Sequence, residues 1–173
     1  VNAVATHIGA NGTADPTRLT VRGGSAGGLM VGACITMRPD LWHCAVAEVP
    51  FVDVVTTMSD PTLPLTVTEW DEWGDPRIEP WASYIASYSP YDNTVSADRP
   101  AMLVTAGLND PRVGFHEPAK WVARLREKRK DDGLTLLHTE MSAGHGGKAG
   151  RFNQLHEIAM VYAFVLLAHD KDE

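Results

Sequence analysis

The sequence predicts an α/β fold in which the strands of a parallel sheet alternate with helices. Four short, mostly apolar runs at 19–22, 44–49, 101–106 and 135–141 have the length and composition of strands. Segments with the composition or spacing of helices lie between and after these runs. This alternation is typical of a parallel sheet with helices on both faces, and no repeat or linker divides the chain into two domains.

The first part of the chain begins directly in a helix-like stretch and then contains a strand, a buried helix and a second strand. The strand at 19–22 stops at two glycines. The segment 29–37 is almost continuously apolar, which is typical of a helix inside the protein, and it ends before Pro39. The run at 44–49 lacks polar alternation, so we expect a strand that is covered on both faces.

Residues 50–100 form a long segment that matches no periodic template. The segment is rich in proline and carries an acidic stretch at 69–72. Long irregular segments in compact domains are usually functional or disordered, and the aromatic side chains of this one argue against disorder. We therefore expect an irregular but ordered segment with a functional role.

The last part of the chain places a strand before a helix twice. The run at 101–106 is again apolar without alternation, and the segment 117–130 has the apolar spacing of an amphipathic helix. A fourth strand is predicted at 135–141, and a long helix from 152 to 165 closes the chain. These elements complete the alternation that indicates a parallel sheet.

The charge balance argues against nucleic acid and membrane surfaces as partners. The 173 residues include 15 Lys and Arg against 22 Asp and Glu, which gives a net charge of −7, whereas a phosphate backbone or an anionic membrane requires a basic surface. No apolar run approaches the roughly 18 to 20 residues that span a bilayer. Cys34 and Cys44 have no partners at zinc-ligand spacing, so we expect free thiols in a reducing, cytoplasmic compartment and no metal ion or cofactor.

A Gly-x-Ser-x-Gly motif lies between the first strand and the buried helix. In Gly23-Gly24-Ser25-Ala26-Gly27 the serine would occupy a strained turn, where glycines on either side let the neighbouring backbone approach. This turn presents the Ser25 hydroxyl at the carboxyl edge of the sheet, and the Ala26 N–H at the helix start points at a developing oxyanion. We therefore predict Ser25 as a nucleophile. The alternative is a glycine-rich turn with a solvent-facing serine.

A base and an orienting carboxylate follow the ends of later strands. His145 lies among small residues in the loop after the fourth predicted strand, which leaves room for its ring over the sheet edge. The other six histidines fall in predicted strands, helices or connecting segments. Asp110 follows the third strand, whereas Asp92 and Asp98 follow no strand. The chain order Ser25, Asp110, His145 is that of an α/β-hydrolase, whose strands would bring the three residues together.

Longer motifs extend this pattern over nearly the whole chain. They are RGGSAGG (22–28), RPDL (38–41), VPFVDV (49–54), EWDEWG (69–74), SYSPYDN (87–93), EPAKW (117–121) and GHGGK (144–148). Together they resemble the prolyl oligopeptidase family of serine peptidases. The resemblance implies an α/β-hydrolase fold, and it assigns the nucleophile, acid and base to Ser25, Asp110 and His145.

The resemblance also implies a substrate class, namely short peptides that are cleaved after arginine or lysine. It places the carboxylate that binds the basic side chain at Glu69 and a second acidic position at Asp71. A carboxylate beside aromatic rings binds a guanidinium by charge-assisted hydrogen bonds, and Trp70 or Trp73 could stack on the same cation. The resemblance assigns Arg112 to a substrate carbonyl. The alternatives are that Glu69 and Asp71 belong to an acidic surface loop and that Arg112 is a surface arginine.

The chain departs from the family pattern ahead of the nucleophile. The family has an N-terminal β-propeller and a first half of the hydrolase sheet, which supplies a tyrosine hydroxyl to the oxyanion hole. We therefore predict residues 1–173 as a partial α/β-hydrolase domain, the C-terminal half only, whose partners are short basic peptides and the missing part of the same enzyme. We do not expect full activity from it alone, because loss of one oxyanion donor costs about 10²- to 10³-fold in rate.

Two other functions stay open. One is a serine esterase or acyl-peptidase of the same fold, in which Glu69 and Asp71 are merely surface residues. The other is a catalytically silent scaffold that keeps the triad residues by descent. Paired arginyl and neutral substrates distinguish the esterase or acyl-peptidase from a peptidase that cleaves after arginine or lysine. A fluorophosphonate probe distinguishes the silent scaffold from an active enzyme, because only an activated Ser25 reacts.

Overall fold

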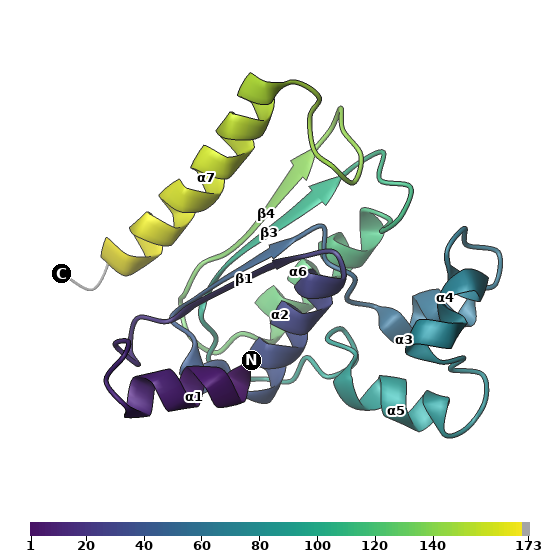
Figure 1. Cartoon of the computed structure of the whole chain (residues 1–173), viewed down its shortest axis with the longest axis horizontal. Coiled ribbons are helices and arrows are strands. Elements are labelled where there is room, and N and C mark those ends of the chain that lie inside the picture. The colour runs from purple at the N-terminus through teal and green to yellow at the C-terminus, as the bar shows by residue number, and fades with distance from the viewer. Residues whose placement is uncertain (171–173) are drawn as a thin grey trace.

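A four-stranded parallel sheet forms the centre of the fold (Figure 1). The computed structural model describes residues 1–170, apart from the side chain of Arg151. The strands follow the spatial order β1-β2-β3-β4, so each strand pairs with the next one along the chain and the connections contain helices. The predicted α/β fold of alternating parallel strands and helices is confirmed. The strands are β1 (Thr20–Gly24), β2 (Cys44–Glu48), β3 (Ala101–Gly107) and β4 (Thr135–Glu140).

Helices cover both faces of the sheet, and the side chains that alternate along each strand divide between them. Ala45 and Ala47 of β2 belong to the larger core, on the side of α2 and α6. Cys44 and Val46 of the same strand pack on the opposite side against α7 (Figure 1). The first helix, α1, packs at the end of α2. These helices are α1 (Asn2–Ala10), α2 (Ala26–Met37), α6 (His116–Lys128) and α7 (Arg151–Asp170), and a short 3₁₀ turn, η1 (Pro39–Leu41), follows α2.

The register of the strands brings their carboxyl ends to one edge of the sheet. Gly24 lies beside Glu48, and Glu48 lies beside Thr105. Gly107 at the end of β3 lies beside Glu140 at the end of β4. The loops that follow these strand ends therefore start close together, and they carry the three predicted triad residues.

Residues 50–100 contain three short helices, so the prediction of a segment without regular elements is wrong. None of the three exceeds eight residues, which is shorter than the 11 to 18 residues over which helical periodicity is recognised. Met58 and Ile85 are fully buried in a separate small core, which supports the prediction that the segment is ordered. The helices are α3 (Val54–Ser59), α4 (Thr66–Trp73) and α5 (Trp81–Tyr88).

The elements around the glycine motif are longer than predicted. Gly23 and Gly24 still pair with β2, so β1 runs up to the serine, and α2 begins directly after it.

No helix within residues 1–170 is long and apolar enough to cross a membrane. Residues 171–173 of the predicted domain lie outside the described residues.

Candidate active site

Ser25 occupies a strained turn between β1 and α2. Its backbone angles are φ 56° and ψ −121°, a region that non-glycine residues rarely adopt and that is often found at functional sites. The Ser25 N–H donates to the Glu48 carbonyl at 2.9 Å, which fixes the turn to the end of β2. A Cβ on Gly23 would lie 2.3 Å from the Gly27 carbonyl oxygen, whereas a Cβ on Gly27 would meet nothing within 4 Å. Close backbone approach therefore requires a glycine at position 23 but not at position 27.

Ala26 contributes the first backbone N–H of α2, next to the serine. Among residues 1–170 this N–H has no hydrogen-bond acceptor, as is normal for the first amides of a helix. Ala26 and Ser25 line the same cavity. An N–H group in this position is free to donate to an oxygen of a molecule bound beside Ser25.

Asp110 and His145 are joined by a hydrogen bond of 2.7 Å between Oδ2 and Nδ1. A carboxylate only accepts hydrogen bonds, so Nδ1 is the donor, and in a neutral imidazole Nε2 is then an acceptor. The other carboxylate oxygen, Oδ1, accepts the backbone N–H groups of Arg112 at 2.8 Å and Val113 at 3.0 Å. The Asp110 side chain is 0% exposed and that of His145 is 17% exposed. The acid is therefore held rigidly while the ring of His145 stays accessible.

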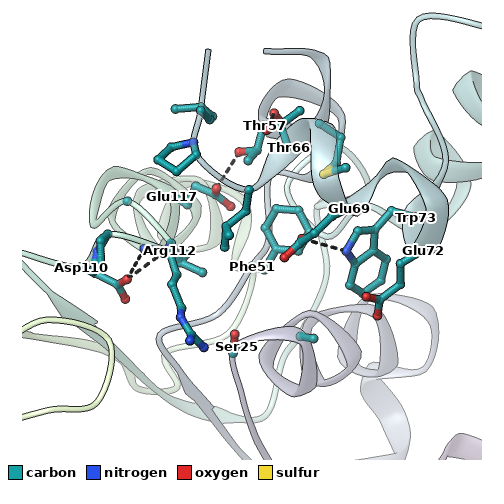
Figure 2. A pocket seen from close by; sticks show the side chains of 18 of the residues that line it. Ser25, Phe51, Thr57, Thr66, Glu69, Glu72, Trp73, Asp110, Arg112 and Glu117 are labelled. Atoms are coloured by element: carbon teal, nitrogen blue, oxygen red, sulfur yellow. Dashed lines mark hydrogen bonds between the residues drawn. The ribbon is translucent and has the colours of Figure 1, made fainter. Parts of the chain in front are cut away.

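Ser25 and Asp110 both line a cavity of about 360 Å³, at the carboxyl edge of the sheet (Figure 2). His145 lines a second cavity of about 200 Å³, together with the ends of β2, β3 and β4. No hydrogen bond joins the Ser25 hydroxyl to His145 within the described part of the chain. The structure thus brings Asp110 and His145 into contact and places Ser25 at the same edge, and the Ser25 to His145 bond is not formed. Such bonds are often long until substrate binds.

Residues 50–100, which we call the insertion, supply the opposite wall of the larger cavity. Figure 2 shows the Glu69 carboxylate directed toward the interior, beside the ring of Phe51. Glu69 Oε2 accepts the Trp73 Nε1–H at 3.1 Å. Phe51 and Trp73 meet edge to face, with ring centroids 5.7 Å apart. This wall combines negative charge with two aromatic rings, which suits a cation with an apolar stem.

Asp71, which is predicted as the second acidic binding residue, does not line this cavity. In α4 the side chains of Glu69, Glu72 and Trp73 share one face at spacings of three and four residues, and all three line the cavity. Asp71 is two residues from Glu69, so it lies near the opposite face, and it is exposed. The second acidic residue of this wall is Glu72.

Trp70 is also turned away from the cavity. Its Nε1–H donates to the Met58 carbonyl at 3.0 Å. The Arg77 guanidinium lies over the Trp70 ring at 4.1 Å from the centroid, so one ring face already holds a cation of this chain. Of the two tryptophans predicted to stack on a ligand, the structure leaves Trp73 at the cavity.

Arg112 lies on the wall that Asp110 belongs to. Its side chain is exposed and lines the larger cavity. Figure 2 shows its guanidinium extending from the Asp110 loop toward Ser25. The group can therefore donate hydrogen bonds to a molecule held between Ser25 and the insertion.

Glu117 is a cavity residue that sequence reasoning missed. It is only 2% exposed, and its carboxylate accepts the N–H groups of Val52 at 3.1 Å and Asp53 at 3.0 Å and the Thr57 hydroxyl at 2.6 Å. Burial raises the pKa of Glu117 above its usual value. Its place four residues before the buried Trp121 was a signal, because this spacing puts Glu117 on the buried face of α6.

The sequence model of the prolyl oligopeptidase family matches residues 1–171. The chain belongs to the prolyl oligopeptidase family. This membership confirms the resemblance that the sequence motifs predicted.

Similarity to individual members of the prolyl oligopeptidase family covers almost all of the chain. The chain is 55% identical to Protease 2 of Moraxella lacunata over 95% of the chain's length. It is 51% identical to dipeptidyl aminopeptidase BI of Pseudoxanthomonas mexicana over 90% of the chain's length. The structure of oligopeptidase B from Leishmania major superposes with a TM-score of 0.94 at 45% identity, over 96% of the chain. These matches cover 24%, 21% and 23% of the respective relatives, so the chain spans about a quarter of their length.

Proposed function

We propose that this chain carries the catalytic residues of a serine peptidase that hydrolyses short peptides after arginine or lysine. The observation that carries the proposal is the Asp110 to His145 hydrogen bond, formed at the sheet edge where Ser25 occupies its strained turn. Family membership supports the peptidase class. The acidic, aromatic wall of the cavity supports the preference for a basic side chain.

The proposed reaction proceeds through an acyl-enzyme on Ser25. The His145 Nε2 accepts the hydroxyl proton as the Ser25 oxygen bonds to the substrate carbonyl carbon, and the Ala26 N–H donates to the resulting oxyanion. His145 then gives the proton to the leaving amine as the peptide bond breaks, and water repeats the sequence to release the acid. Asp110 keeps the proton on Nδ1 and stabilises the imidazolium. These steps need no metal ion or cofactor.

Specificity is assigned to the insertion wall. Glu69 binds the guanidinium or ammonium of the residue before the scissile bond, Trp73 and Phe51 contact its apolar stem, and Glu72 adds negative charge at the rim. Arg112 donates to a carbonyl of the bound peptide. Because the chain spans about a quarter of its relatives' length, we also propose that these residues act as part of a longer enzyme. The free thiols of Cys34 and Cys44 support a cytoplasmic location for this enzyme.

The test uses the full-length protein, a fluorophosphonate probe and matched arginyl, lysyl and neutral fluorogenic substrates. We expect labelling that Ser25→Ala abolishes, and faster cleavage of the two basic substrates. Equal cleavage of the neutral substrate would favour an esterase or acyl-peptidase. No labelling would favour a silent scaffold and would overturn the proposal. Ser87→Ala, which removes a hydroxyl that donates to the nearby Tyr84 carbonyl, is the matched control.

A second candidate is removal of dipeptides from a free N-terminus. The 51% identity to dipeptidyl aminopeptidase BI favours it. One arginyl dipeptide substrate, compared with a free and with a blocked amino group, distinguishes the two activities. An oligopeptidase tolerates the block, whereas an aminopeptidase requires the free amine.

A further inference from the structure

The loop that carries His145 is closed at its base by an ion pair. Glu140 is the last residue of β4, and its Oε2 lies 2.8 Å from the Lys148 Nζ. The seven residues at 141–147, with His145 among them, form the loop between these two positions. The pair thus joins the two ends of the segment that holds the proposed base.

Each member of this pair makes a second contact that ties the loop to the fold. The other Glu140 oxygen, Oε1, accepts the Ser142 N–H at 3.1 Å and the Ser142 hydroxyl at 2.7 Å. The backbone N–H of Lys148 donates to Glu157 Oε1 of α7 at 3.0 Å. Lys148 and Ser142 together lower the pKa of Glu140 to about 2, so the carboxylate is charged at neutral pH.

The loop is anchored differently on its two sides. On the side of Asp110, the Asn109 N–H donates to the Ala143 carbonyl at 3.1 Å, and a Cβ on Gly107 would lie 2.7 Å from the Gly144 carbonyl oxygen. This close packing fixes the entry to the loop. After the tight turn in which the Gly147 N–H donates to the Gly144 carbonyl at 3.2 Å, the exit is held by the Glu157 carboxylate of α7, which packs against Gly147 and accepts the Lys148 N–H, and by the Lys148 side chain on Glu140.

We propose that Glu140 and Lys148 are a positioning pair that holds His145 within reach of Ser25. The inference rests on the proposed function, in which Ser25 is the nucleophile and His145 is its base. Lys148 is 42% exposed and Glu140 is 15% exposed, and ion pairs near the surface contribute little to the stability of a fold. A displacement of a catalytic group by about 1 Å, in contrast, can cost up to about 10²-fold in rate. Loss of the pair should therefore slow the reaction much more than it destabilises the protein.

The kinetic test replaces Lys148 in the full-length protein. Lys148→Met keeps the length of the side chain and removes its charge, so we expect kcat and the rate of fluorophosphonate labelling to fall about 10- to 100-fold, with KM within about twofold. Lys148→Arg restores the pair and should recover most of kcat. Lys128→Met is the matched control, because Lys128 is 38% exposed and pairs with Glu127 at 3.2 Å at the end of α6.

Hydrogen–deuterium exchange of the loop peptide gives a readout that does not depend on turnover. Lys148→Met should speed exchange at 141–148 and leave the melting temperature close to that of the wild type. A fall in kcat that only parallels a fall in melting temperature, without rescue by Lys148→Arg, would mean a merely structural role and overturn the inference.

The labelling experiment separates this inference from the proposed function. A wild-type protein that does not react with the probe overturns both together. Normal labelling of the wild type, combined with unchanged kcat and exchange in Lys148→Met, overturns only the positioning role.

Discussion

The two walls of the larger cavity are built from different kinds of structure. The sheet-edge wall carries Ser25 and Asp110, which are fixed by backbone hydrogen bonds at the ends of buried parallel strands. The insertion wall carries Glu69 and Trp73 on α4, a helix of eight residues whose only buried residue is Thr66. Groups that react need fixed positions, whereas groups that select a side chain need only the right charge and shape.

Under the proposed function, this contrast separates the reacting groups from the groups that select the substrate. The sheet edge is fixed by the register of all four strands, so any change there would shift several groups together. Helix α4 is held by side chains such as Trp70, whose indole N–H reaches the Met58 carbonyl, and it can change its residues without moving the strands. Changes in the first wall should therefore affect every substrate, and changes in the second should affect substrates by their charge.

The largest expected effect follows from Asp110→Asn. The asparagine oxygen keeps the N–H groups of Arg112 and Val113, but its amide then donates to His145 Nδ1 and forces the proton onto Nε2. His145 can no longer accept the Ser25 proton, so we expect kcat to fall by about 10⁴-fold for arginyl and neutral substrates alike. Steady-state kinetics with the paired substrates measures both.

The control for this substitution is Asp15→Asn. Asp15 also accepts a backbone N–H two residues later, at 2.9 Å from Thr17, but it is exposed and lies in the loop before β1. We expect wild-type kinetics from it. A loss in Asp110→Asn that depended on the charge of the substrate would contradict the separation of the two walls.

The next effect is expected from Glu69→Gln, which tests the insertion wall. The amide keeps the size of the side chain and an oxygen for the Trp73 indole, but it removes the charge that faces the cavity. Arginyl substrates should lose about 2 to 4 kcal/mol of transition-state stabilisation, while a neutral substrate changes little. Comparison of kcat/KM for the two substrates measures this difference. An equal fall for both would show that Glu69 supports the fold instead of binding the substrate.

The fold and the sheet-edge wall could be predicted from the sequence because backbone rules fix them. Apolar runs located all four strands, and the glycine motif located the turn at Ser25. Parallel strands must end at a common edge, so placing Asp110 and His145 after strand ends was enough to bring them together.

The insertion wall could be predicted only in part, because the phase of a short helix decides which side chains face the cavity. Asp71 and Glu72 are neighbours in the sequence, and only the rotation of α4 turns one outward and the other inward. Three helices of at most eight residues give no usable periodicity, so that rotation could not be derived. Phe51 was missed for a related reason, since its place depends on how the chain turns after β2.

A smaller effect is expected from Glu72→Gln, which uses this helical phase as the test. Glu72 is exposed at the rim of the cavity, where solvent weakens its interaction with a cation. We expect kcat/KM for arginyl substrates to fall less than about tenfold, with a larger effect at low salt. Asp71→Asn is the matched control and should change nothing. A larger loss from Asp71→Asn than from Glu72→Gln would contradict the orientation of α4.

The smallest effect on catalysis, with a distinct effect on stability, is expected from Glu117→Gln at the junction of the two walls. Glu117 of α6 accepts hydrogen bonds from the chain entering α3, and burial raises its pKa. The stability that it contributes is fully present below its ordinary pKa and is lost as the pH rises through the raised pKa of the folded state.

Glutamine keeps an acceptor for the two backbone N–H groups but cannot ionise. Denaturant unfolding of the full-length protein should therefore show Glu117→Gln gaining stability relative to the wild type as the pH rises above the ordinary pKa of a glutamate. Glu117→Ala leaves those N–H groups unpaired and should be destabilised at every pH, by about 1 to 3 kcal/mol. A difference between wild type and Glu117→Gln that did not change with pH would mean that the buried carboxylate is not the group that responds to pH at this junction.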